Sequence, residues 1–155
     1  MKQIKHFALI FIFALTLNSC KKETTPVKSK TELICNGNWI IKSITVNPGI
    51  DVGGVVITDW LTQREPCEND NYDKFESSGS GVTNEGATKC NPAGPQTFAF
   101  TWSFKNNETV LTYDGDDCDI NTLSENELIF GPTYDGDDCG GIPGIKYKFT
   151  ATFRH

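Results

Sequence analysis

Two acidic segments are the part of this chain whose residue types could bind a metal ion. Residues 112–118, Thr-Tyr-Asp-Gly-Asp-Asp-Cys, recur unchanged as residues 133–139. Carboxylates clustered on turns hold hard cations such as calcium through oxygen ligands. The candidate calcium ligands are Asp114, Asp116, Asp117, Asp135, Asp137 and Asp138. Because the spacing is not that of an EF-hand, we favour the alternative of two solvated Asp-Gly turns and expect no cofactor.

Histidine chemistry is almost absent from the sequence. The only histidines are His6 and His155, and no Cys-x-x-Cys motif exists, so a zinc site of histidine and cysteine is not expected. Nucleophilic machinery of the Ser-His or Cys-His type also needs a histidine held beside the nucleophile. Hydrolysis by a pair of carboxylates remains open, but no spacing singles out a pair. The sequence therefore favours a protein that is not an enzyme.

The first twenty residues form a segment typical of export. Lys2 and Lys5 precede an apolar run over residues 7–17, and the small residue Ser19 stands before Cys20. The run is too short for a permanent membrane span, which indicates a cleaved signal peptide over residues 1–19. A signal that ends at a cysteine resembles that of bacterial lipoproteins, which implies lipidation of Cys20 and attachment to the cell envelope. The alternative is an ordinary signal peptide with a chance cysteine.

Residues 20–32 follow as a lipidated N-terminus and polar tether, and Ser29 and Glu32 have the spacing of a capping box for one helical turn. Lys21, in place of an aspartate, favours the outer membrane by analogy with other lipoproteins. Without its two signal lysines the chain has 12 basic and 20 acidic residues, a formal charge of −8. No basic patch is available to neutralise phosphates, so nucleic acid is not an expected partner. We expect the membrane to be one partner, through the lipid anchor.

Short strands predict an all-β domain over residues 33–155. The strongest alternation runs over residues 97–104, where Phe98, Phe100, Trp102 and Phe104 share one face. About eight such strands joined by tight turns predict a single up-and-down antiparallel barrel, which closes its own edges. Residues 47–71 are expected to be a long apolar-bearing connection, with one short helix capped by Thr58 or Asp59.

An ordered set of motifs resembles the lipocalin-like domain of small lipoproteins from Bacteroidota. The set comprises Gly37-Asn38-Trp39, Thr58-Asp59-Trp60, Pro66-Cys67-Glu68-Asn69-Asp70, Glu85-Gly86-Ala87-Thr88-Lys89-Cys90 and Trp102-Ser103. The resemblance covers residues 33–155 and implies an eight-stranded barrel. It also implies that Trp39 lies at the closed end with a basic residue of the last strand, Arg154, packed over it.

Strand direction places four cysteines at the open end. The expected disulfides are Cys67–Cys90, which the resemblance also supports, and Cys118–Cys139, which follows from strand direction alone; three pairings of the four are possible. Cys35 lies at the closed end and is left as the odd thiol.

The interior aromatic face suggests a pocket for a small apolar or amphipathic ligand. Its expected lining is Phe98, Phe100, Trp102 and Tyr147, under a loop that carries Trp60. An eight-stranded barrel is just wide enough to be filled by side chains or to hold one small ligand. The alternative is therefore a filled barrel that serves as a structural or protein-interaction component of the envelope. Trp60 fits a lid anchor, a partner contact or a buried plug.

Overall fold

The structure is a computed structural model that describes residues 26–155. The expected signal peptide, Cys20 and the first part of the tether lie outside the described residues. Within the described range, no helix is both long and apolar enough to cross a membrane.

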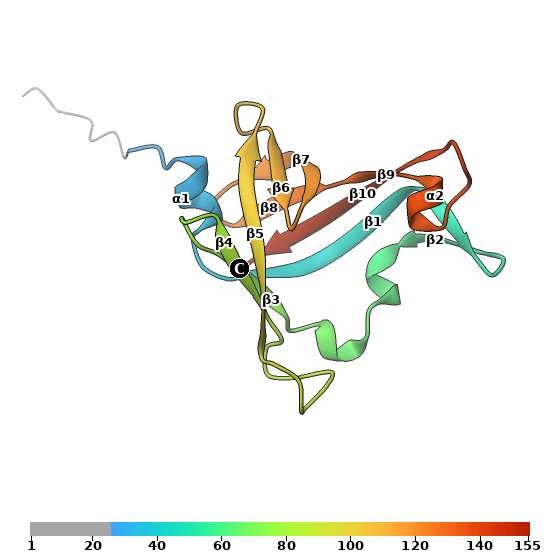
Figure 1. Cartoon of the computed structure of the whole chain (residues 1–155), viewed down its shortest axis with the longest axis horizontal. Helices are drawn as coiled ribbons and strands as arrows, with labels where there is room; N and C mark the ends of the chain where they lie inside the picture. Colours follow the sequence, from blue (N-terminus) through green and yellow to red (C-terminus); the bar gives the residue numbers. More distant parts are fainter. Residues whose placement is uncertain (1–25) are drawn as a thin grey trace, which may run out of the picture.

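Antiparallel strands joined mainly by short turns make up most of the described chain (Figure 1). The strands are β1 (Trp39–Val52), β2 (Val55–Asp59), β3 (Tyr72–Phe75), β4 (Ser80–Asn84), β5 (Thr97–Lys105), β6 (Val110–Tyr113), β7 (Asp116–Leu123), β8 (Glu127–Gly131), β9 (Thr133–Asp135) and β10 (Lys146–Arg154). The helical segments are α1 (Lys30–Ile34), η1 (Trp60–Gln63), η2 (Pro66–Glu68) and α2 (Gly136–Cys139).

The sheet closes on itself, as the sequence predicts. Its order is β2-β1-β3-β4-β5-β6-β7-β8-β10-β9, and β1 also pairs with β10 along a register that runs from Ile40↔Arg154 to Asn47↔Lys148. With β2 and β9 set aside as extensions, β1, β3–β8 and β10 form an eight-stranded antiparallel barrel. The other side of the barrel closes through β1 and β3, which pair at Trp39↔Asp73 and Ile40↔Tyr72.

The connection expected over residues 47–71 is in large part sheet. β1 continues to Val52 and returns through a turn at Gly53 and Gly54 into β2, so the expected loop begins with a hairpin. Ile50 on this hairpin is buried with Val46 and Tyr147 in a small second core, which explains why the strand extends beyond the barrel. The predicted short helix is present as η1, capped by the Asp59 carboxylate, which accepts a hydrogen bond from the Leu61 amide at 3.1 Å.

The main core lies inside the barrel and is rich in aromatic rings. Phe75 packs edge-on against Phe100 and Trp102, with ring centroids 5.2 and 5.6 Å apart. Phe104 packs against Trp102 from the same strand. Phe98 shares the face of Phe100, since β5 pairs with β4 without a register shift, but it lies outside the packed core and is 48% exposed.

The closed end of the barrel is sealed around Trp39. The expected capping box is present at α1: the Ser29 hydroxyl accepts from the Glu32 amide, and the Glu32 carboxylate accepts from the Ser29 amide. α1 delivers the carbonyl of Ile34 to the indole Nε1 of Trp39, which donates to it at 2.7 Å.

The basic partner of Trp39 is His155, and the expectation for Arg154 is wrong. The rings of Trp39 and His155 have centroids 4.1 Å apart. Arg154 instead donates to Glu127 at 2.7 Å on the outer surface. Strand alternation is the reason, since Phe153 points into the barrel and its neighbour Arg154 must point out.

Candidate functional site

A cavity of about 270 Å³ opens into the barrel beside Trp39. Its volume lies near the lower end of the range for small-molecule sites, roughly 300–1,000 Å³. The lining residues are Trp39, Ile41, Arg64, Asn71, Tyr72, Asp73, Thr83, Tyr113 and Phe153. They come from β1, β3, β4, β6, β10 and the segment between η1 and β3, so five strands and one connection converge on one space.

The lining of the cavity is partly apolar and partly polar. Trp39 and Ile41 of β1 and Phe153 of β10 supply the apolar side. The polar side consists of Arg64, Asn71, Asp73, Thr83 and Tyr113. Such a lining can hold a molecule that has an apolar body and a polar end.

Asp73 is the most deeply buried charged group of the site, with only 7% of its surface exposed. The Thr83 hydroxyl donates to its Oδ1 at 2.6 Å, and the Tyr113 hydroxyl donates to its Oδ2 at 3.0 Å. Burial raises the pKa of the Asp73 carboxyl, while these two hydrogen bonds and the charge of Arg64 oppose the rise. Burial, together with the negative charge of Asp73, also raises the pKa of Tyr113, which keeps its hydroxyl a donor.

Arg64 and Asn71 reach the cavity with atoms that lack partners. Arg64 Nη1 and Asn71 Oδ1 are both buried and make no hydrogen bond. The other side of the guanidinium is held, since Arg64 Nε lies 3.5 Å from Glu68 Oε2. Buried polar atoms are normally paired, so the unpaired atoms of these two lining residues are groups that a bound molecule could satisfy.

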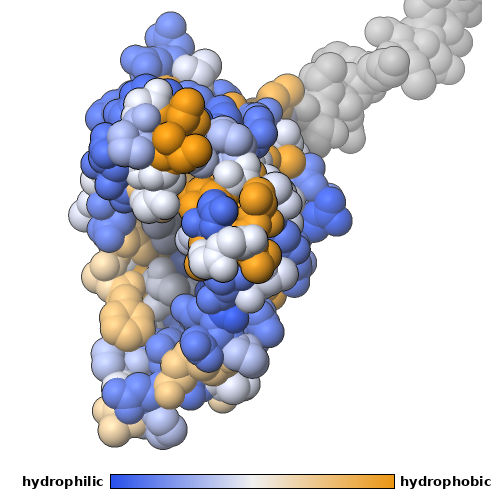
Figure 2. All heavy atoms as spheres, turned by 90° about the vertical axis from the view of Figure 1, so that its right-hand side faces the viewer, coloured by the Kyte–Doolittle hydropathy of each residue, from blue (hydrophilic) through white to orange (hydrophobic). Residues whose placement is uncertain are grey.

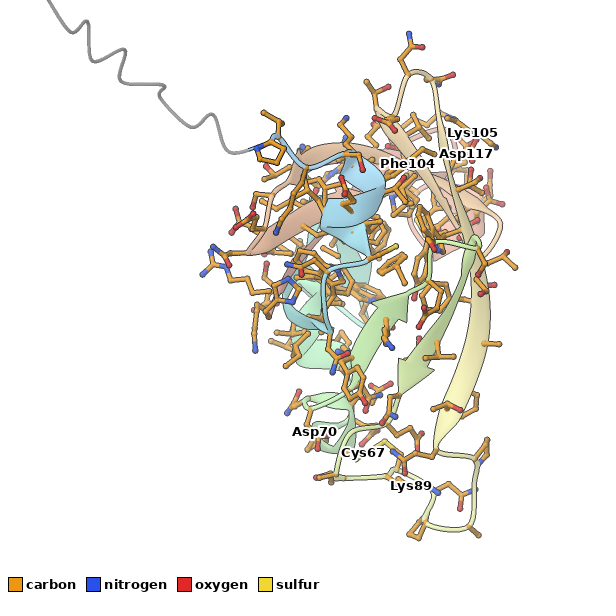
Figure 3. All side chains as sticks on the ribbon, turned by 90° about the vertical axis from the view of Figure 1, so that its left-hand side faces the viewer. Cys67, Asp70, Lys89, Phe104, Lys105 and Asp117 are labelled. Atoms are coloured by element: carbon orange, nitrogen blue, oxygen red, sulfur yellow. A yellow bond between two sulfur atoms is a disulfide. The ribbon has the colours of Figure 1, made fainter. Side chains whose placement is uncertain are left out.

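The segment that carries Arg64 and Asn71 is fastened to a distant loop by the disulfide Cys67–Cys90, which confirms the predicted pairing. Asp70 adds a second attachment, because its Oδ2 accepts from the amides of Ala87 at 2.7 Å and Thr88 at 3.0 Å. The first of these bonds is the main reason that the pKa of Asp70 is lowered. Figure 3 shows Cys67, Asp70 and Lys89 together at one end of the molecule, far from Phe104 and Asp117.

Gly86 is required for this attachment. Its φ is +65°, and a Cβ there would lie 2.7 Å from Asp70 Oδ2. A side chain at this position would therefore push the Asp70 carboxylate away from the two amides it binds.

The residues predicted to bind a ligand do not line the cavity. Phe100 and Trp102 are buried in the packed core, Phe98 is exposed, and Tyr147 belongs to the second core with Val46 and Ile50. Large aromatic side chains fill the part of the interior around Phe100 and Trp102, and the open space lies beside Asp73 and Thr83. Trp60 packs edge-on against Phe149 at 5.6 Å, which makes it an anchor for the η1 segment that leads to Arg64.

The acidic repeat does not assemble a metal site. Among residues 26–155, no three side chains of the His, Cys, Asp and Glu types are placed to hold a metal ion together. Asp117 accepts from Lys105 at 2.8 Å, and Asp135 accepts from Lys146 at 2.8 Å. Asp116 accepts from Tyr134 at 2.7 Å.

The two copies of the repeat also adopt different structures. Asp114 and Gly115 both have positive φ and form a tight hairpin turn between β6 and β7. In the second copy, Asp135 and Gly136 lead from β9 into α2, and a Cβ on Gly136 would lie 1.9 Å from the Ile142 carbonyl oxygen. The expectation of two equivalent Asp-Gly turns therefore holds for the first copy only. Asp137 and Asp138, from the second copy, lie exposed in the first turn of α2.

The second predicted disulfide is absent from the described residues, where Cys35, Cys118 and Cys139 are thiols. Cys118 points into the main core and is 2% exposed, whereas Cys139 ends α2 and packs on the second core. The inward direction of Cys118 on β7 therefore separates it from Cys139. Asp117, the neighbour of Cys118, lies far from Cys67 (Figure 3), so the expectation of four cysteines at one end is wrong. Burial raises the pKa of the Cys118 thiol to about 12.

Comparison with known protein families decides the affiliation of the chain. The model of the lipocalin-like domain matches residues 36–130. This chain belongs to the lipocalin-like domain family. The matched range begins just before β1 and ends in β8, so it includes every strand of the barrel except β10. A comparison with curated proteins finds no match.

For this lipocalin-like domain, sequence reasoning missed the polar side of the cavity. One signal was present: Asp73 stands two residues before Phe75 in the short strand β3, so both face inward. A carboxylate on the inner face of a strand needs partners, and it could have marked the site.

Proposed function

We propose that this protein is a lipid-anchored binding module of the cell envelope that takes up one small amphipathic molecule in its barrel. The observation that carries this function is the mixed lining of the cavity, in which the apolar residues Ile41 and Phe153 occur together with Arg64 and Asn71, each of which has a buried atom without a partner. A molecule that covers the apolar side gains hydrophobic energy, and its polar end can pair with the orphaned atoms. The lipocalin-like family supports a ligand-binding role for the barrel.

The anchor is proposed from the sequence, in which Lys2, Lys5 and the apolar run lead to Cys20. α1 lies against the closed end, where Ile34 packs in the core with Trp39. A tether that leaves from α1 would therefore depart from the closed end. With the tether at the closed end, the membrane would not cover the segment that carries Arg64.

The test uses four probes that share one phenyl group: L-phenylalanine, 3-phenylpropionate, phenethylamine and 3-phenylpropanol. Isothermal titration calorimetry of the lipid-free chain is expected to show one-to-one binding of at least one probe. Ile41→Trp adds bulk inside the cavity and should abolish that binding. Val55→Trp adds the same ring on a surface position that is 60% exposed and should leave binding unchanged. If none of the four probes binds, the proposed function is wrong.

A second candidate function, a contact with another envelope protein, is favoured by an exposed apolar surface. Val55 and Val56 on β2 and Ile142 after α2 are each at least 60% exposed. Figure 2 shows apolar atoms grouped on this face amid hydrophilic ones. Photo-crosslinking in intact cells from position 56, compared with position 105 at the other end of the barrel, tests this function. A protein captured from position 56 alone would support it, and equal capture from both would not.

A further inference from the structure

Two opposite charges line the cavity without contacting one another. Arg64 and Asp73 both face it, and the ion pairs of residues 26–155 join Arg64 to Glu68 but not to Asp73. The guanidinium therefore keeps Nη1 buried and without an acceptor. Asp73 uses its two oxygens to accept from the hydroxyls of Thr83 and Tyr113, and no cation contacts it in the described chain.

The cavity also offers an unused acceptor beside Asp73. Asn71 directly precedes β3 and stands two residues before Asp73, and both residues line the cavity. Its Oδ1 is buried and accepts no hydrogen bond. Of the residues that line the cavity, Arg64 thus has an unpaired donor and Asn71 an unpaired acceptor, which favours a ligand that both accepts and donates hydrogen bonds.

We propose that the ligand is a small zwitterion of the amino-acid type, with its carboxylate on Arg64, its ammonium group between Asp73 and Asn71, and an apolar side chain against Ile41 and Phe153. This assignment rests on the proposed function and names the ligand class of the same cavity. A guanidinium binds a carboxylate through charge-assisted hydrogen bonds, and an ammonium group supplies three donors for carboxylate and amide oxygens.

The charges around the cavity explain why both ligand groups are needed. A simple carboxylate would satisfy Arg64 but would meet the negative charge of Asp73. A simple amine would satisfy Asp73 but would leave Nη1 of Arg64 buried and unpaired. A buried charge without a partner is unfavourable, so each half-ligand retains one unfavourable group that the zwitterion removes.

The four phenyl probes measure this preference in the unmodified protein. L-phenylalanine should bind more tightly than 3-phenylpropionate, phenethylamine and 3-phenylpropanol by about tenfold or more, the scale of one charge-assisted contact. If another probe binds as well as L-phenylalanine, or better, the zwitterion proposal is wrong while the proposed binding function stands. If no probe binds, both are wrong.

Two substitutions separate recognition from damage to the fold. Arg64→Gln should weaken binding of L-phenylalanine and 3-phenylpropionate but not of phenethylamine. Asp73→Asn should weaken binding of L-phenylalanine and phenethylamine but not of 3-phenylpropionate. Arg154→Gln is the matched control, because it removes the same charge from an arginine that pairs with Glu127 outside the cavity. Equal loss of all probes in either cavity variant would overturn the assignment, since it would indicate structural damage.

Discussion

The Tyr113 hydroxyl donates a hydrogen bond to Asp73 across the interior of the barrel, at 3.0 Å and over 40 residues of sequence. Their strands, β6 and β3, are not neighbours, because β4 and β5 lie between them in the sheet. The bond therefore crosses the barrel beside the cavity, and it fixes both the carboxylate and the ring that line it.

Tyr113→Phe should lower the free energy of unfolding at neutral pH by about 1–3 kcal/mol, the usual cost of a buried acceptor that loses its donor. Tyr134→Phe is the matched control, because it removes a similar hydroxyl bond, to Asp116 at 2.7 Å, at the exposed surface. Urea unfolding of both variants gives the comparison. An equal loss of unfolding free energy in both variants would show that the interior hydrogen bond stabilises the fold no more than the surface one.

The stability of the fold should depend on pH through Asp73. Burial raises the pKa of this carboxyl above its ordinary value of 3.8, although Thr83, Tyr113 and Arg64 facing it oppose the shift. A group with a raised pKa stabilises the fold when protonated, so its contribution is full below 3.8 and is lost as the pH rises through the higher folded pKa. Asp73→Asn removes the buried charge and should raise the melting temperature at pH 7 more than at pH 3. A larger gain at pH 3 would contradict this sign.

Loss of the disulfide should weaken both the fold and the site. The bond closes a loop with a sequence separation of 23, for which chain entropy predicts about 3 kcal/mol. Cys67→Ala with Cys90→Ala should lower the melting temperature and weaken binding of any cavity ligand, because Arg64 and Asn71 flank Cys67. The same double variant is the control for reductant: dithiothreitol should destabilise the natural protein and leave the variant unchanged. A further drop in the variant would reveal a second disulfide.

The three thiols should differ in reactivity. Cys118 is 2% exposed and its pKa is raised to about 12, so iodoacetamide at pH 8 should modify it last. Cys35 and Cys139 are half-buried and should react sooner. Mass spectrometry of the native protein after timed labelling measures the order. Rapid labelling of Cys118 would contradict its placement in the core.

The barrel could be predicted from the sequence because its strands repeat with a period of two. Phe100 and Trp102 face the core as alternation requires, and Phe153 does so on the last strand. β4 is harder to predict, because it begins with Ser80 and Gly81, residue types typical of a turn. In fact the Phe100 ring lies over Gly81, where a Cβ would be 2.3 Å from it, so the glycine makes room for the core.

The site was not predictable in the same way. Its polar side combines β3, β4 and β6 with Arg64, which follows η1, and no local pattern links these segments. The search for aromatic residues led to the filled part of the barrel, because large rings remove space as well as create apolar surface. The disulfide was predictable from strand direction and resemblance, whereas the position of Cys118 depended on which way one residue of β7 faces.

The pairing of β1 with β10 has a consequence for how this chain is made. The first strand of the barrel pairs with the last one, and the pair Ile40↔Arg154 can form only after Arg154 has been synthesised. A ribosome or an export channel releases the N-terminal side first, so β1 stays without this partner until nearly the whole chain has emerged. Contacts so distant in sequence slow folding, and the interval leaves an apolar strand available to chaperones or to other nascent chains. Release of the C-terminal strand is thus the event that ends this exposure.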